Sequence, residues 1–272
     1  MPELPEVETV ANGVHERVHG QTISAVWTSN KPQTFKSPPT LIADVLTGAR
    51  IARVHRVGKT IVMDLDSPTA GASAQFLIHL GMTGRLLVST PDTPVPAHTH
   101  AVLTLSGSRE LRFVDARRFG RLSVSAPLET YTGPGTEPLT ILLEDFVALF
   151  RGRKTPIKAA LLNQSLLHGV GNIYADESLF RAGIRPRRQA GQLTRLQLSH
   201  LRDALQSVLL HAIDLGGSSV SDYVDADGVR GFFQLEHRVY MRTGQPCLVC
   251  GTPIKRILVG GRGTHFCSSC QK

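Results

Sequence analysis

The chain of 272 residues is 41% hydrophobic and 19% charged, which excludes a disordered polymer and leaves room for two domains. Its formal net charge of +8 is unevenly distributed along the chain. Residues 1–150 carry 13 basic and 14 acidic side chains, whereas residues 151–272 carry 17 basic and 8 acidic ones. No run of about 18 apolar residues occurs, so no membrane-spanning helix is expected. The basic C-terminal half suggests a polyanionic partner, for which nucleic acid is the first candidate and an anionic membrane surface the second. The alternative is that these charges form a solvent-exposed face without a partner.

The N-terminal half is expected to start with a helix and continue as strands. From Pro5 on, apolar residues recur at helical spacing at Val7, Val10, Ala11, Val14 and Val18. Residues 21–125 then contain short apolar segments, many separated by Gly/Ser turns: TISAVW, RIARVH, TIVMDL, AQFLIHL, RLLVS, AVLTLS, LRFVD and RLSVS. They predict an antiparallel sandwich or barrel. The acidic opening MPELPEVETV lacks the features of a secretory signal, so we expect a cytoplasmic protein.

A Gly/Pro-rich stretch at 130–138 separates this half from a helical one. Apolar stripes at helical spacing follow in ILLEDFVALF, IKAALL, NIYADESLFRAG and LTRLQLSHLRDALQSVLLHAIDLGG. Residues 217–232 have no clear period and are predicted to form a long loop. We therefore expect an α+β protein in three parts: a β-sandwich with a leading helix (1–132), a helical domain that includes the 217–232 loop (133–240), and a C-terminal metal module (241–272).

All four cysteines lie near the C-terminus with the spacing C-x2-C-x16-C-x2-C. Two such knuckles can present four thiolates to one ion, which predicts a zinc site formed by Cys247, Cys250, Cys267 and Cys270. The intervening IKRILVGGRGTHF has the glycine-rich centre of a zinc-ribbon hairpin. Four protein ligands leave no open position, so the metal would be structural. Two disulfides are the alternative, which fits poorly with a chain lacking an export signal.

The first residues of the chain include a candidate nucleophile. Removal of the initiator methionine would expose Pro2 as a secondary α-amine with a pKa near ~8, far more of it neutral at pH 7 than a lysine with a pKa near ~10.4. Its attack on an aldehyde carbon gives an iminium that has no N–H to lose, stays cationic and draws electrons in an elimination. Glu3 and Glu6 lie beside it at a helix N-terminus, which favours acids. Ordinary helix capping is the alternative.

Several segments together resemble formamidopyrimidine-DNA glycosylase, a bacterial family that removes oxidised purines from DNA. They are PELPEVETV at the start, HLGMTGRL at 79–86, DARRFGRL at 115–122, GVGNIYADESLFRAGIRP at 169–186 and the cysteine module. The likeness runs in the family's order from Pro2 to Gln271. It identifies IKAALLNQSLLHGVGNIYADESLF with a helix–two-turn–helix motif. The resemblance also implies that the partner is double-stranded DNA with oxidised bases or abasic sites, and that the protein does not bind a membrane. A monomer would suffice for one lesion.

The resemblance implies a set of catalytic residues. Pro2 would attack C1′ of the damaged nucleotide, and Glu3 would act as the acid, protonating the sugar as the base departs, with Glu6 close by. Lys59, in the turn RVGKT, looks like the family's lysine that assists β-elimination; without the family it would be interpreted as a solvated turn lysine. Arg262 resembles the arginine that grips phosphates beside the lesion and is linked to δ-elimination. The expected product is a one-nucleotide gap with phosphate at both ends.

The resemblance also implies DNA-binding residues. Met82, Arg117 and Phe119 match the trio that fills the void left by an everted base, with core packing as the alternative for Met82 and Phe119. His98, Arg153 and Lys154 match positions that contact DNA in the family. Lys158 and Asn172 match positions that contact phosphates around the lesion. The 217–232 loop resembles a flexible lid over the everted 8-oxoguanine.

Two other functions stay open at this point. The first is an endonuclease VIII-like enzyme for oxidised pyrimidines, which Leu4 and the 217–232 loop disfavour because such enzymes usually open with PEGPE and lack the purine lid. The second is a non-catalytic zinc protein that binds damaged DNA, which would need neither a free Pro2 nor Glu3. The chain also departs from the family pattern at Met241, where glycine is usual.

Overall fold

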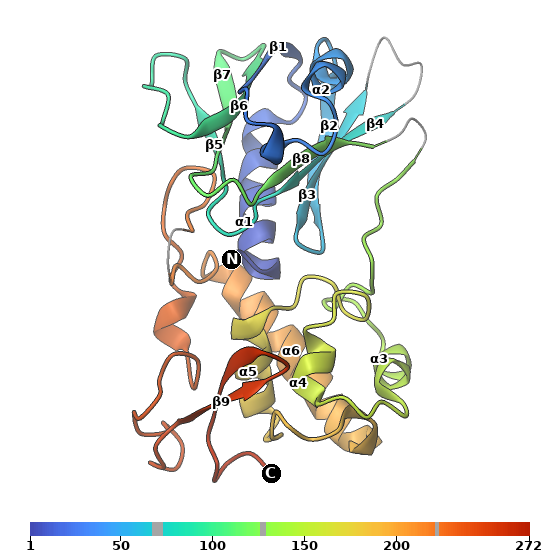
Figure 1. Ribbon diagram of the computed structural model, residues 1–272, viewed down its shortest axis with the longest axis vertical. Coiled ribbons are helices and arrows are strands. Elements are labelled where there is room, and N and C mark those ends of the chain that lie inside the picture. The colour runs from blue at the N-terminus through green and yellow to red at the C-terminus, as the bar shows by residue number, and fades with distance from the viewer. Residues whose placement is uncertain (67–72, 126–128, 221–222) are drawn as a thin grey trace. The chain divides into compact units, whose positions relative to one another are not determined.

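The computed structural model describes residues 1–66, 73–125, 129–220 and 223–272 (Figure 1). Its contacts divide the chain into two compact units. The first unit comprises Met1–Thr132 together with Gly216–Phe232, and the second comprises Gly133–Leu215 together with Phe233–Lys272. Among the described residues, no helix has the length and apolar character needed to cross a membrane.

The first unit is built from two antiparallel four-stranded sheets and a leading helix. One sheet has the order β1-β6-β7-β5 and the other β2-β3-β4-β8. The strands are β1 (Ile23–Thr28), β2 (Arg50–Val57), β3 (Thr60–Asp66), β4 (Ala74–His79), β5 (Arg85–Ser89), β6 (Thr99–Leu105), β7 (Arg109–Val114) and β8 (Arg121–Val124). Each coincides with one of the apolar segments predicted from the sequence, which confirms the antiparallel sheet architecture.

Helix α1 (Leu4–Val18) packs its apolar stripe into the core of this unit. Val7, Val10 and Val14 are at most 1% exposed and join one cluster with residues of both sheets, such as Ile61 and Leu111. The helix follows from the predicted spacing, with Pro5 in its first turn. A second helix, α2 (Pro39–Leu46), and a 3-10 turn (Pro32–Thr34) were not anticipated within the region assigned to strands.

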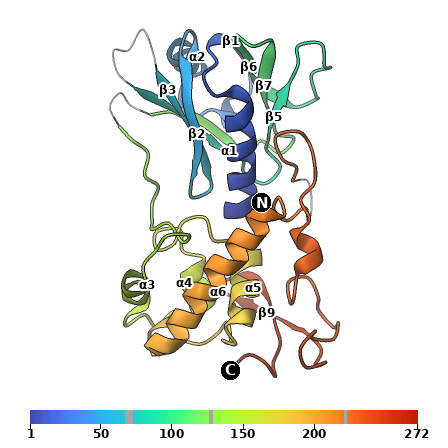
Figure 2. The same cartoon turned by 180° about the vertical axis from the view of Figure 1, so that it is seen from behind.

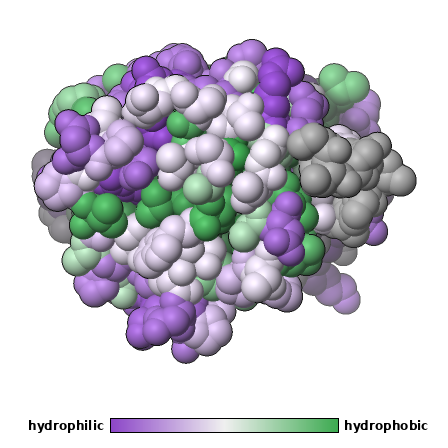
Figure 3. Space-filling model, turned by 90° about the horizontal axis from the view of Figure 1, so that it is seen from above, coloured by the Kyte–Doolittle hydropathy of each residue, from purple (hydrophilic) through white to green (hydrophobic). Residues whose placement is uncertain are grey.

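Figure 3 shows one face of the structure, with apolar side chains seen between hydrophilic ones. The first unit exposes a few large apolar side chains, among them Trp27 and Leu41. Isolated exposed apolar residues of this kind are normal for a folded protein and identify no partner by themselves.

The second unit is helical with a terminal hairpin (Figure 2). Its helices are α3 (Leu143–Phe150), α4 (Ile157–Leu161), α5 (Asn172–Arg181) and α6 (Arg195–Asp214), with 3-10 turns at Ala190–Gln192 and Phe233–Glu236. Strands β9 (Lys255–Val259) and β10 (Arg262–Phe266) form the hairpin. Helix α6 begins with a capping box in which Thr194 and Gln197 bond each other's backbone N–H, as the sequence TRLQ favours.

The 217–232 loop belongs to the first unit, not to the helical domain to which its sequence position assigned it. Two of its apolar residues, Tyr223 and Ala226, enter the core cluster that α1 and the sheets form. The Ala226 carbonyl also accepts a hydrogen bond from the Val88 N–H at 3.0 Å. The burial of Tyr223 and Ala226 therefore groups this loop with the first unit, although it follows the helices of the second unit in the sequence. The division into three domains stays a prediction.

Candidate active site and metal centre

The N-terminus of α1 holds two buried carboxylates next to Pro2. Pro2 itself is buried, and Glu3 and Glu6 are 5% and 2% exposed. The Glu3 N–H donates to Glu6 Oε2 at 2.7 Å, and the Glu3 side chain accepts from the Glu6 backbone in a capping box. This arrangement pairs otherwise unsatisfied helix N–H groups with carboxylates, and it fixes both acids beside the start of the chain.

The 217–232 loop returns to this same helix end. The Ser218 N–H donates to the second oxygen of Glu6, Oε1, at 2.7 Å. The Tyr223 hydroxyl lies 3.3 Å from the Glu6 carbonyl and 3.1 Å from the Gly216 carbonyl. Burial, aided by the Glu6 charge, raises the pKa of Tyr223 above its usual range, so its hydroxyl stays protonated. Glu6 thus links the Pro2 end of α1 to the loop.

A glycine is needed where the loop passes Glu6. Gly217 has φ +81°, and a Cβ added there would lie 2.9 Å from Cγ of Glu6. Any other residue would be strained in this backbone conformation and would push against the buried carboxylate.

Lys59 lies in an electropositive region of the same unit. It occupies the turn between β2 and β3, and the following residue, Thr60, pairs with His79 of β4. The His79 pKa is lowered by burial and then by the positive charges of Lys59, Lys36 and Arg121. His79 Nδ1 accepts a hydrogen bond from the Gly81 N–H at 3.1 Å, so neutral His79 carries its proton on Nε2. Sequence reasoning did not single out His79, although it is the first residue of the HLGMTGRL segment.

The predicted wedge residues lie on two exposed loops rather than in the core. Met82 is 39% and Phe119 48% exposed, and the guanidinium of Arg117 stacks 4.8 Å from the Phe119 ring centre. The loops touch, because a Cβ on Gly81 would lie 2.5 Å from the Phe119 carbonyl carbon. Exposure of both apolar side chains argues against the core-packing alternative.

Asp115, which is fully buried, organises these two loops. Its Oδ1 accepts from the Thr83 hydroxyl at 2.5 Å and from the Arg117 N–H at 3.2 Å. Its Oδ2 accepts from the Gly120 N–H at 2.7 Å. The sequence pattern DARRFGRL did not indicate this role for its aspartate. Three other predicted DNA contacts, His98, Arg153 and Lys154, are exposed.

In the second unit, Lys158, for which the resemblance implies a phosphate contact, has close partners within the protein. Its side chain is fully buried, and its Nζ lies 2.7 Å from Asp176 Oδ1 and 2.8 Å from the Thr264 hydroxyl. It also donates to the Gly263 carbonyl at 3.1 Å. Because these partners surround the ammonium group, Lys158 fastens the β9–β10 hairpin instead of projecting into solvent.

Helix α5 carries the other side chains that hold the hairpin. Asn172, at its first position, donates to the Gly263 carbonyl at 3.0 Å. One turn later, Asp176 Oδ2 accepts from the His265 N–H at 2.8 Å. The next residue, Glu177, accepts three consecutive backbone N–H groups, of Arg238, Val239 and Tyr240, at 2.9–3.0 Å. Asp176 of GNIYADE therefore binds the hairpin, and Glu177 binds the segment 238–240.

Replacing Asp176 by asparagine is expected to lower the free energy of unfolding by about 3–5 kcal/mol, because it leaves the Lys158 ammonium buried without a counter-charge. Urea unfolding of the full chain measures this. Asp203→Asn serves as the control, since the Asp203 side chain is 56% exposed in its pair with Arg202. Equal unfolding midpoints for the Asp176 variant and the parent would contradict the expectation.

Arg262 lies at the tip of the hairpin and is exposed. It follows Gly260 and Gly261, which have φ +56° and +74°. Two consecutive residues with positive φ match a tight type I′ turn, which explains the two glycines. Arg262 is therefore exposed beside a tight turn, and Lys158, Asn172 and Asp176 bind the β10 residues that directly follow it.

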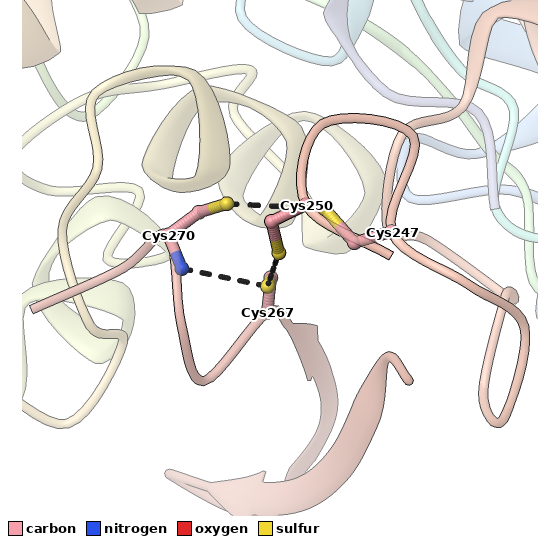
Figure 4. Close-up of side chains that lie close together, drawn as sticks. All are labelled: Cys247, Cys250, Cys267 and Cys270. Carbon is pink, nitrogen blue, oxygen red and sulfur yellow. Dashed lines mark hydrogen bonds between the residues drawn. The ribbon is translucent and has the colours of Figure 1, made fainter. Parts of the chain in front are cut away.

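The four cysteines converge on one point (Figure 4). Their sulfur atoms all lie within 4.8 Å of one another, with 3.9 Å between Cys247 and Cys270 and 3.5 Å between Cys250 and Cys267. A tetrahedral zinc ion with Zn–S bonds of ~2.3 Å holds its sulfurs ~3.8 Å apart. A disulfide needs ~2.05 Å, so the alternative of two disulfides does not fit. The site suits one structural zinc ion with no open coordination position.

Three family models match the chain in order. The N-terminal domain of formamidopyrimidine-DNA glycosylase matches residues 1–122, its H2TH domain matches 134–224, and a zinc finger found in FPG and IleRS matches 244–272. The chain belongs to the formamidopyrimidine-DNA glycosylase family. The formamidopyrimidine-DNA glycosylases of Solibacter usitatus and Thioalkalivibrio sulfidiphilus are 46% and 42% identical to it, with both chains covered completely.

Solved structures of this family share the fold. The MutM (FPG) protein of Thermus thermophilus is 41% identical with a TM-score of 0.86, covering 99% of this chain and 98% of that one. A Lactococcus lactis FPG variant in complex with DNA containing Fapy-dG is 34% identical with a TM-score of 0.90 over the full length of both chains. L. lactis Fpg bound to DNA with an abasic site has a TM-score of 0.88 at 34% identity, covering 99% of both chains. The predicted family and fold are thus confirmed, and the protein is a DNA-repair glycosylase.

Proposed function

We propose that this glycosylase removes oxidised purines, 8-oxoguanine and formamidopyrimidines, and then cleaves the DNA strand through a Schiff base on Pro2. The observation that carries the proposal is the buried start of α1, where two carboxylates are held beside Pro2 by backbone hydrogen bonds. Structures of the L. lactis relative with Fapy-dG DNA and with abasic-site DNA support the substrate class.

The chemistry begins when removal of Met1, which is 51% exposed, frees the Pro2 nitrogen. The neutral nitrogen attacks C1′, and the C1′–base bond breaks with its electron pair going to the base. The proton of the Pro2 N–H passes to the departing base, which frees the nitrogen lone pair. Glu3 donates a proton to the sugar ring oxygen as the ring opens, which leaves a cationic iminium between Pro2 and C1′.

Strand cleavage follows from the iminium. Loss of a C2′ proton, assisted by Lys59, sends electrons toward the cationic nitrogen and expels the 3′ phosphate. Loss of the C4′ proton then drives a second elimination, which breaks the C5′–O bond and expels the 5′ phosphate, with Arg262 holding that phosphate. Water then hydrolyses the remaining iminium, which releases the unsaturated sugar remnant as an aldehyde and restores Pro2. The strand is left with a one-nucleotide gap bearing phosphate at both ends.

The DNA-binding surfaces fit a flipped-out nucleotide. Met82 and Phe119 would fill the space left in the stack, and Arg117, stacked on Phe119, would hydrogen-bond the base left unpaired. His98, Arg153, Lys154, Asn172 and Arg262 would contact the backbone. Lys158 would act mainly by holding the hairpin that presents Arg262. One monomer suffices for one lesion, and the enzyme would work on DNA in the cytoplasm.

The test uses the purified full chain and duplexes that carry 8-oxoguanine, formamidopyrimidine-guanine, an oxidised thymine or an abasic site. We expect efficient cleavage of the two purine lesions and the abasic site, with phosphate at both gap ends. Preference for the oxidised thymine would favour the endonuclease VIII-like alternative. Binding without any cleavage would leave only the non-catalytic zinc protein.

A further inference from the structure

The turn that carries Lys59 is tethered to α1 by a nearly buried arginine. Val57 pairs with Thr60, so Gly58 and Lys59 form a two-residue turn between β2 and β3. Gly58 has φ +62° while Lys59 keeps an ordinary backbone, as in hairpins with glycine at the first turn position. Figures 1 and 2 both show this turn beside the N-terminal half of α1.

Arg56 makes the connection. Its side chain is only 4% exposed, and its Nε lies 2.6 Å from Glu8 Oε2, two residues beyond Glu6 on α1. A second guanidinium nitrogen donates to the Gly58 carbonyl at 3.1 Å. One rigid planar group thus bonds both the helix that starts at the catalytic end and the peptide that precedes Lys59.

We propose that Arg56 and Glu8 are positioning residues that hold Lys59 at a fixed place relative to the N-terminus of α1. This inference rests on the proposed function of Lys59 in elimination. A flexible lysine on a two-residue turn can assist proton transfer only where its backbone is fixed, and misplacement by about 1 Å can cost as much as 10²-fold in rate. Neither residue touches the reacting atoms in this account, since both act through the turn.

A second ion pair on the same two strands is solvent-exposed and serves as a comparison. Arg50 pairs with Asp66 at 3.2 Å at the opposite end of the hairpin, but the two side chains are 55% and 58% exposed. That pair contributes little in water, whereas the Arg56 guanidinium is desolvated and bonds the turn itself. Arg50→Gln is therefore the matched control for Arg56→Gln.

The experiment measures base excision and strand cleavage separately, by single-turnover kinetics on 8-oxoguanine and abasic-site duplexes. Arg56→Gln and Glu8→Gln are compared with Lys59→Ala, and each is also made in the Lys59→Ala background. We expect Arg56→Gln to slow the Lys59-dependent step about tenfold, with Glu8→Gln slowing the same step to a lesser extent. In the Lys59→Ala background neither change should slow that step further.

Several outcomes would overturn the inference. A full effect of Arg56→Gln in the Lys59→Ala background would mean that it acts on something other than Lys59, and equal effects of Arg50→Gln would mean that the hairpin is only generally weakened. If Arg56→Gln does not fold, Glu8→Gln decides alone, since glutamine keeps the size of Glu8 at a partly exposed site. No effect of Lys59→Ala itself would instead contradict the proposed role of Lys59.

Discussion

Replacing Glu3 by glutamine is expected to slow excision of 8-oxoguanine about 10²- to 10⁴-fold, the range that a positioned general acid contributes. Glutamine keeps the side-chain carbonyl that the capping box uses, so α1 should form normally, but it has no proton to give as the base departs. Cleavage of a duplex that already contains an abasic site should fall much less. Single-turnover kinetics on the two substrates measure the difference.

Glu16→Gln is the control for this variant, because Glu16 lies on the same helix with a side chain that is 75% exposed. It should leave both rates unchanged. If Glu3→Gln slowed the abasic-site reaction as much as base excision, its role would be to support the helix end. If excision kept its full rate, another group would have to be the acid.

Loss of the zinc site should abolish tight DNA binding. Structural zinc ions contribute about 10–16 kcal/mol of binding free energy in isolated fingers, so a module without metal is not expected to keep its fold. Cys267 is fully buried in a cluster with Phe180, Val239 and Ile254, and the β10 strand that holds Arg262 ends just before it. We expect Cys267→Ala to weaken binding about 10²-fold or more, because Arg262 loses its anchored position.

Fluorescence anisotropy with a lesion duplex at fixed salt measures this loss, since binding through phosphates depends steeply on salt. Leu248→Ala is the control: Leu248 lies between two of the ligands but is 57% exposed. A Cys267→Ala protein that binds DNA with the parent's affinity, or that still produces gaps at the parent's rate, would show that the zinc module is dispensable.

Much of the fold could be predicted from local patterns. Alternation and turn residues located the strands of the first unit, and the paired cysteine knuckles located the metal site. Helix α2 was missed because it is short and contributes only two buried apolar residues, Ile42 and Leu46, to the core. A segment with so few core contacts leaves little periodicity to detect.

The arrangement of the site was harder to predict, because it depends on contacts between distant residues. The carboxylate of Glu6 bonds Ser218, 212 positions away, and no local period indicates that pairing. The family resemblance implied a phosphate contact for Lys158, but it gave no sign that Asp176 and the hairpin also bind this ammonium group. Met241, where the family usually has glycine, has φ +57°, so the structure gives a conformational reason for the glycine.

Trapping the enzyme on an abasic-site duplex with borohydride, followed by mass spectrometry of the adduct, identifies the nucleophile. Reduction converts the iminium into a stable amine, so the modified peptide reveals the attacking nitrogen. We expect an adduct on the peptide that begins with Pro2, and none when extra residues precede Pro2. An adduct on Lys59 or another lysine, or full strand cleavage by the extended protein, would contradict it.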